Sequence, residues 1–252
     1  LLQMAEMDPN LVSSDGLSIN EQFEQISSSA HELVEQQYQV LNEVLIPKLE
    51  AENIQFLRRD CWSASQKAWL EKYFNEELLP ILTPVGLDSA HPFPRIPNKS
   101  LNFIISLTGK DAFGRNSGRA VLQAPRALPR IIQLPPCETD SGPHDFVFLS
   151  SIIHAFVNDL FNGMMVKGCY QFRVTRNSEL YIDEEEAANL LKAVENELQK
   201  RRRGNAVRLE VERNCPPEVA AELLANLDLQ PVDLYRIDGP LSPRRLMAIC
   251  EG

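Results

Sequence analysis

The sequence lacks the patterns by which metal and redox sites are usually recognised. Its five cysteines are scattered, and no two of them form a Cys-x-x-Cys pair. Neither a zinc ribbon nor a thioredoxin-type redox site is therefore supported. Scattered cysteines, odd in number, are typical of a reduced cytosolic protein. No apolar run approaches the roughly 20 residues that cross a bilayer, so no transmembrane segment is predicted.

Nucleotide-binding and catalytic motifs are missing as well. No glycine-rich loop precedes a Lys-Ser/Thr pair, no GxGxxG opens a helix, and no GxSxG, HExxH or kinase-type HRD and DFG segment occurs. His31 and His144 have no nearby cysteines or paired carboxylates, and His154 lies in an apolar helix, where a packed histidine is expected. Asp88 and His91 stand three apart in a proline-rich loop, so an enzyme of unknown type that uses this pair stays an alternative.

Positive charge is scarce overall but locally concentrated. The formal net charge is −10, which argues against broad nucleic-acid binding yet permits a narrow basic groove. Arg173 and Arg176 follow a strand pattern and could face phosphate or pair with Glu179 and Glu210. The densest basic group, predicted to end a helix, is Arg201, Arg202 and Arg203. We interpret Arg126 and Arg130 as surface residues.

The first part of the chain predicts a long helix. Ser18-Ile-Asn-Glu21 fits a capping box, and apolar residues then recur every three or four positions as far as Leu45. Pro47 should kink this helix or start a new one. Ser63 and Gln66 offer a second capping box. We place a domain boundary near Leu57, which makes 1–57 the C-terminal part of a truncated helical domain.

The remainder, 58–252, predicts an α+β domain. Five prolines in 80–100 indicate a rigid, largely extended connection. Strands are expected at 101–108, 119–124, 130–134, 206–212 and 233–238, and a hairpin at 169–175 and 179–182. Helices are expected at 151–161, 183–204 and 216–227. This irregular interleaving of helices with strands favours α+β over a doubly wound parallel sheet.

Several short segments, in order along the chain, carry a resemblance to a known family. They are LTPVGLDSAHPFP (82–94), NKSLN (98–102), APR and LPR within 124–130, FRVTRN (172–177), AVRLE (206–210) and YRIDGPL (235–241). In series they resemble the head domain of bacterial polyphosphate kinases of the histidine-phosphorylating type. The match implies that the chain covers the end of the helical N-terminal domain and the head domain.

The resemblance also implies a function for the full-length enzyme. Such enzymes reversibly transfer the terminal phosphate of ATP to polyphosphate through a phosphohistidine, with Mg²⁺, and the covalent step divides one difficult transfer into two. Their reactive histidines and most nucleotide contacts lie in two C-terminal domains, and none of the four histidines here matches them. The resemblance therefore assigns no catalytic, cofactor-binding or metal-binding residue to this chain.

For this part of the enzyme, the resemblance implies a supporting role. The head domain is expected to take part in a homo-oligomer and to wall the tunnel that houses polyphosphate. Candidates for lining that route are Arg173, Arg176, Arg201, Arg202 and Arg203. A cytoplasmic location follows, with membrane association open for the full-length enzyme, and nucleic acid is not an expected partner.

Both chain ends look cut. Because the resemblance places the reactive histidines in C-terminal domains outside this sequence, we expect this chain alone to be inactive. An alternative of a different class is a stand-alone oligomerisation or scaffold module without an enzymatic role.

Overall fold

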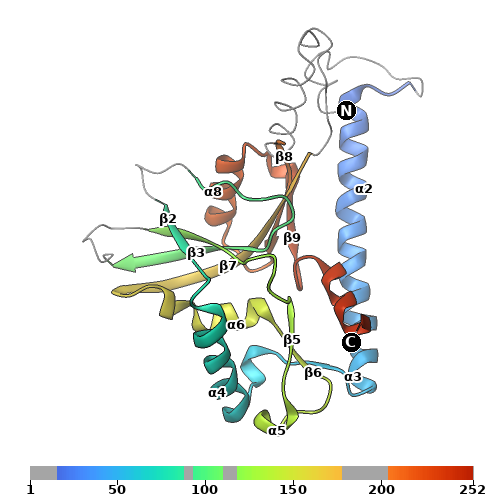
Figure 1. Cartoon of the computed structure of the whole chain (residues 1–252). Coiled ribbons are helices and arrows are strands. Elements are labelled where there is room, and N and C mark those ends of the chain that lie inside the picture. The colour runs from blue at the N-terminus through green and yellow to red at the C-terminus, as the bar shows by residue number, and fades with distance from the viewer. Residues whose placement is uncertain (1–15, 88–92, 110–117, 178–203, 252) are drawn as a thin grey trace, which may run out of the picture. The chain divides into compact units, whose positions relative to one another are not determined.

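The computed structural model describes residues 16–87, 93–109, 118–177 and 204–251 (Figure 1). The chain forms two compact units, Leu1–Lys48 and Leu49–Gly252. The predicted strand at 179–182 and most of the predicted helix at 183–204 lie outside the described residues. The domain boundary near Leu57 stays a prediction.

The first unit contains the predicted long helix, α2 (Ile19–Val40). Its capping box is confirmed, because the backbone N–H of Glu21 donates to Ser18 Oγ while the Ser18 N–H donates to the Glu21 carboxylate. The helix passes into a π-helical turn, η1 (Leu41–Leu45), and then into α3 (Ile46–Ala51).

The π turn explains how the helix continues past Pro47. A proline ring in an α-helix clashes with the carbonyl four residues earlier, here that of Glu43. In η1 the hydrogen bonds span five residues, as from the Ile46 N–H to the Leu41 carbonyl. This spacing widens the helical turn around the Glu43 carbonyl. Of the two effects expected of Pro47, a kink or a new start, the structure shows a new start, since α3 begins at Ile46.

The same arrangement ends the next helix. The second predicted capping box, between Ser63 and Gln66, opens α4 (Ala64–Tyr73) and is confirmed. A second π turn, η3 (Phe74–Leu78), follows shortly before Pro80, with the Leu79 N–H donating to the Phe74 carbonyl.

A six-stranded sheet forms the centre of the second unit, in the order β2-β4-β3-β7-β8-β9. The strands are β2 (Pro84–Leu87), β3 (Asn102–Gly109), β4 (Arg119–Gln123), β7 (Met164–Arg176), β8 (Ala206–Glu212) and β9 (Leu234–Ile237). All neighbours are antiparallel except β8 and β9, which are parallel. Strand β2 was not predicted, because it lies in 80–100, where five prolines indicated an extended connection and not a paired strand.

A three-stranded sheet, in the order β1-β6-β5, lies in the same unit. Its strands are β1 (Gln55–Phe56), β5 (Ile131–Gln133) and β6 (Asp145–Phe148). The remaining helical segments are η2 (Arg59–Cys61), α5 (Pro136–Thr139), α6 (Leu149–Phe156), η4 (Val157–Leu160), α8 (Pro217–Leu227), η6 (Pro231–Asp233) and η7 (Pro243–Glu251).

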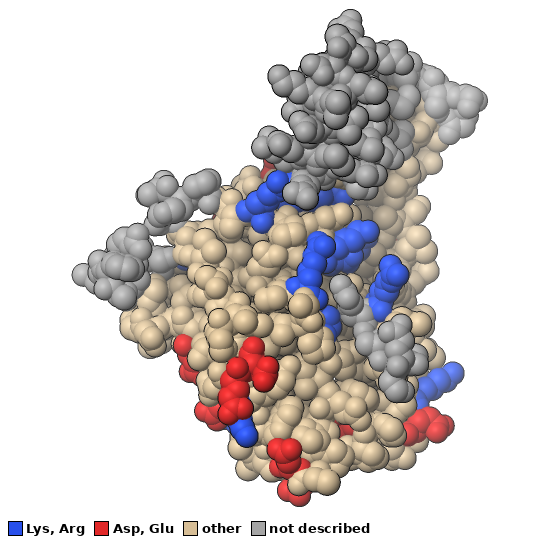
Figure 2. All heavy atoms as spheres, in the orientation of Figure 1, with Lys and Arg blue, Asp and Glu red and all other residues tan. Residues whose placement is uncertain are grey.

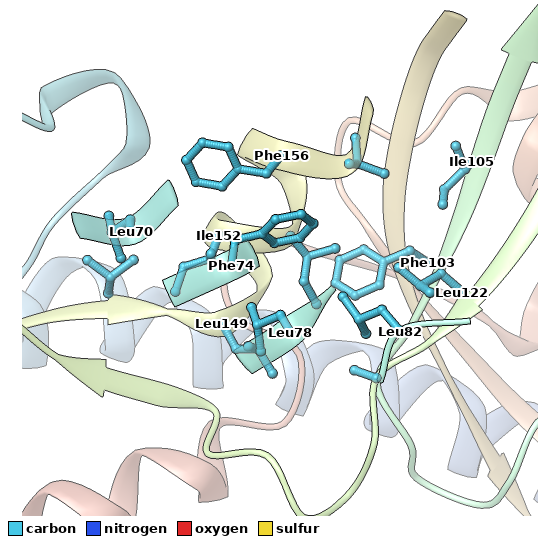
Figure 3. Close-up of a cluster of buried hydrophobic side chains, with 14 of the residues drawn as sticks. Leu70, Phe74, Leu78, Leu82, Phe103, Ile105, Leu122, Leu149, Ile152 and Phe156 are labelled. Carbon is cyan, nitrogen blue, oxygen red and sulfur yellow. The ribbon is translucent and has the colours of Figure 1, made fainter. Parts of the chain in front are cut away.

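Each face of the large sheet carries its own core, because successive strand residues point to opposite faces. On one face Phe103 and Leu122 pack with residues of α4, η3 and α6, among them Phe74 (Figure 3). On the other face Phe172, Leu209 and their neighbours pack against α8. Mixed sheets with helices on both faces confirm the α+β class.

Candidate functional site

Arg173 lies on β7, and its positive charge is compensated within the fold. Its Nη1 donates to Glu210 Oε2 at 2.6 Å. Glu210 lies directly opposite Arg173 on the neighbouring strand β8. The other carboxylate oxygen, Oε1, accepts from Arg208 Nη2 at 2.7 Å. The Glu210 side chain is only 4% exposed. Of the two partners the sequence allowed for Arg173, phosphate or carboxylate, the structure provides the carboxylate.

The two arginines and Glu210 connect three neighbouring strands. The Arg208 guanidinium lies 4.0 Å from the ring centroid of Tyr235 on β9, a cation–π geometry. A buried carboxylate between two guanidinium groups is a strong hydrogen-bonded arrangement, so this cluster holds β7, β8 and β9 in register. Its place on a phosphate route stays a prediction.

Arg176, at the end of β7, is held differently. Its Nε donates to the Ile96 carbonyl at 2.8 Å and its Nη1 to the Gly204 carbonyl at 3.0 Å. Burial lowers the pKa of the Arg176 guanidinium below its usual value, and the nearby positive charge of Arg95 lowers it further. Carbonyl groups orient a guanidinium but leave its net charge in place.

A loop that runs from Pro94 to Ser100 brings further cations beside Arg176. Arg126 Nη2 donates to the Asn98 carbonyl at 2.5 Å, and Arg95 and Lys99 are exposed on the loop itself. We call Arg95, Lys99, Arg126 and Arg176 the basic patch. Figure 2 shows several Lys and Arg side chains close together on one face, while most of the Asp and Glu side chains on that face lie lower in the view.

Sequence reasoning found only part of this surface. Arg126 was interpreted as a surface residue, and its exposure confirms this, but its proximity to Arg176 could not be foreseen. The available signal was the pair Arg95 and Lys99, two cations separated by a short proline-containing segment. The other predicted route residues, Arg201, Arg202 and Arg203, lie outside the described residues, as do Asp88 and His91.

A cleft of about 750 Å³ lies elsewhere in the second unit. His154 of α6 and Glu212 of β8 face each other in it, with 3.4 Å between His154 Nε2 and Glu212 Oε2. The His154 ring also meets Phe103 edge-on at 5.5 Å between centroids, so the predicted packed histidine is confirmed. Its carboxylate partner was not predicted, since no sequence spacing relates the two.

Glu212 is stabilised in its charged form. Burial pushes the pKa of its carboxyl up, but His154, the Gln171 N–H at 3.1 Å and the Asn214 side chain together lower the pKa below its usual value. Arg58, Arg59 and Arg213 also line the cleft, and Asp60 and Asp238 balance two of them. With charges of both signs at its rim, the cleft is a weaker anion site than the basic patch.

The described residues contain no cluster of metal ligands, and burial disfavours the reactive form of two of their thiols. Within the ranges that the structure covers, no three His, Cys, Asp or Glu side chains gather as metal ligands would. Burial raises the pKa of the Cys169 thiol well above its usual range and that of Cys215 to about 11, which disfavours the reactive thiolate. None of the described helices combines the length and apolarity that crossing a bilayer requires.

Comparisons with known proteins decide the family. The model of the polyphosphate kinase N-terminal domain matches residues 1–57, and the model of the polyphosphate kinase middle domain matches residues 65–249. The chain belongs to the polyphosphate kinase family. The resemblance that the sequence segments carried is thereby confirmed.

Named relatives agree with this assignment. The chain is 50% identical over 237 residues to a polyphosphate kinase of Pseudomonas syringae pv. tomato, covering 94% of this chain and 32% of that protein. It is 50% identical over 244 residues to one of Neisseria gonorrhoeae, covering 97% and 36%. The chain thus spans about a third of the length of these relatives.

A solved structure shares the fold. The crystal structure of polyphosphate kinase from Porphyromonas gingivalis matches with a TM-score of 0.67 at 23% identity, covering 90% of this chain and 32% of that one. At this identity the likeness concerns the fold alone.

Proposed function

We propose that this chain is the N-terminal and middle part of a polyphosphate kinase that reversibly transfers the terminal phosphate of ATP to polyphosphate through a phosphohistidine. The observation that carries the proposal is the ordered match of the two domain models over most of the chain, together with relatives about three times as long. ATP, Mg²⁺ and the reactive histidine are assigned to the rest of such a polypeptide.

Two of the described histidines, His144 and His154, support this division of labour. His154 is packed against Phe103 and faces Glu212, so its ring is engaged in the fold. His144 is exposed in a loop and does not line the cleft. A phosphorylated histidine needs a site that binds nucleotide and Mg²⁺ and stabilises the transferred group, and neither residue has one among the described groups.

We assign two supporting roles to this part of the enzyme, in oligomerisation and in guiding polyphosphate. Ile81 and Val85 are 46% and 43% exposed and lie before and within β2, an edge strand of the six-stranded sheet. Apolar side chains exposed at a sheet edge favour association with another chain. For the polyphosphate route, Arg176 is favoured over Arg173, because a carboxylate already compensates Arg173.

A labelling experiment tests the assignment of the chemistry. The 252-residue chain is incubated with ATP labelled at the γ-phosphate and Mg²⁺, beside a polypeptide extended to the length of the relatives. We expect no covalent label and no polyphosphate from the chain alone, and both from the longer polypeptide. Covalent label on the 252-residue chain would contradict the proposal, as would an inactive full-length polypeptide.

Light scattering tests the oligomeric role separately. We expect the chain to associate in solution and Val85→Lys to shift it toward the monomer. Lys67→Glu, on the exposed side of α4, serves as the control. A monomeric wild-type chain would remove the support for this role.

A further inference from the structure

The basic patch is built around one short loop. Arg176 Nε reaches the Ile96 carbonyl and Arg126 Nη2 reaches the Asn98 carbonyl, two residues further on. Arg95 and Lys99 flank these two carbonyls in the sequence. Five extended residues span at most about 18 Å, so all four positive groups lie within reach of one short linear ligand.

The positive charges of the patch are not neutralised by the described part of the fold. None of its four side chains forms an ion pair with a carboxylate in the ranges that the structure covers. Arg119, Arg208 and Arg213, by contrast, each lie within 3.0 Å of a carboxylate oxygen. Burial lowers the pKa of the Arg176 guanidinium, and the positive charge of Arg95 lowers it further.

The loop that carries the patch is held in one conformation. Pro94 and Pro97 restrict its backbone, and Lys99 adopts a left-handed conformation with φ of 57°. The Lys99 N–H donates to the Val174 carbonyl at 2.8 Å, and the Arg176 N–H donates to Asn98 Oδ1 at 2.9 Å. Because the backbone of the loop is fixed in advance, binding requires little ordering of the loop itself.

We propose that the basic patch binds a linear chain of phosphates, with Arg95, Lys99, Arg126 and Arg176 contacting successive phosphate groups. This rests on the proposed function. Of the four residues, only Arg176 was among the route candidates that the sequence suggested. Guanidinium groups bind phosphate oxygens in a fork, and the Lys99 ammonium adds a point charge. A ligand with a negative charge on every unit relieves the repulsion between Arg95 and Arg176.

Arg95 and Lys99 are the best residues to change. Both side chains are exposed, and neither has a hydrogen bond or ion pair with the rest of the described structure, so their replacement should leave the fold intact. The test variant is the double substitution Arg95→Gln and Lys99→Gln. The matched control is Lys67→Gln with Lys72→Gln, which removes the same charge from exposed positions of α4.

The measurement is the binding of fluorescently labelled long-chain polyphosphate to the 252-residue chain between 50 and 200 mM salt. If four cations contact a single-stranded polyanion, the logarithm of affinity should fall with the logarithm of salt with a slope of about −2.8, and of about −1.4 for the double variant. The same relation makes the double variant bind about 25-fold more weakly at 100 mM salt. The control should bind as wild type does.

Three outcomes would overturn the inference. They are a double variant with wild-type affinity and salt slope, a control weakened as much as the test variant, and single-stranded DNA of equal charge that competes as well as unlabelled polyphosphate. The proposed function is judged apart, by polyphosphate synthesis in the longer polypeptide. If the longer polypeptide makes polyphosphate but the double variant binds polyphosphate as wild type does, the role of the basic patch is refuted and the proposed function is not.

Discussion

Replacing Glu210 by glutamine should reveal how much of this fold depends on one buried carboxylate. The substitution keeps the size of the side chain but leaves Arg173 and Arg208 without their negative partner. Removing one member of a buried ion pair costs about 3–5 kcal/mol, because the remaining charge is left in a poorly solvated place.

The exposure of the two arginines sets where in this range the effect should fall. Glu210 is 4% exposed, but the arginine side chains retain 17% and 27%, so water screens part of the uncompensated charge. We therefore expect a loss near the lower end, about 3 kcal/mol of unfolding free energy. For a domain of this size that corresponds to a melting temperature lower by about 6–12 °C.

Urea unfolding followed by circular dichroism measures the loss, and Glu222→Gln provides the control. Glu222 pairs with Arg119 at 3.0 Å, with exposures of 34% and 25%, and such partly solvated pairs contribute about 1 kcal/mol or less. A Glu210→Gln variant no less stable than the Glu222→Gln variant would refute the burial argument. If Arg173 also contacts polyphosphate, Glu210→Gln should in addition tighten polyphosphate binding.

Three further changes probe other parts of the structure. Because the folded-state pKa of Glu212 is lowered, its ionised form stabilises the fold above the unfolded value near 4.5, and this stability is lost as pH falls through the folded pKa. Glu212→Gln should therefore be less stable than wild type in denaturant titrations at pH 7, and the difference in unfolding free energy should narrow below pH 4.5. A difference that stays constant with pH would contradict a stabilising role of the ionised carboxylate. Ser63→Ala removes the capping oxygen of α4 and should cost about 1 kcal/mol, whereas a neutral result in the same titration would mean that the cap is dispensable. Phe103→Ala empties a fully buried site and should cost about 4 kcal/mol, and a loss below 1 kcal/mol would show that the core collapses around the gap.

Local patterns predicted much of this fold. Both capping boxes form as expected, since a Ser hydroxyl and an acidic or amide side chain three residues later satisfy each other's backbone N–H groups. The alternation of 206–212 gave β8 with the predicted bounds, because an amphipathic strand needs only its own side chains to be recognised. The ordered family segments likewise required no spatial information.

Long-range pairing was beyond the reach of those patterns. Pro84 and Gly86 do not favour a strand, yet β2 forms because β4 supplies partners at an available edge of the sheet. Arg173 and Arg176 look alike in the sequence, but the fold places Glu210 of β8 beside Arg173. Beside Arg176 it places the carbonyl groups of Ile96 and Gly204.

The sequence by itself determined the family, the α+β class and the separate helices and strands, because each depends on residues close together in the chain. The tertiary structure decided which charges meet. Glu210 lies 37 residues from Arg173 in the sequence. Arg126 donates to Asn98, 28 residues earlier in the sequence, and Arg176 donates to Ile96, 80 residues earlier. Whether a carboxylate compensates the charge of an arginine depends on their distance in space, and only the folded structure sets that distance.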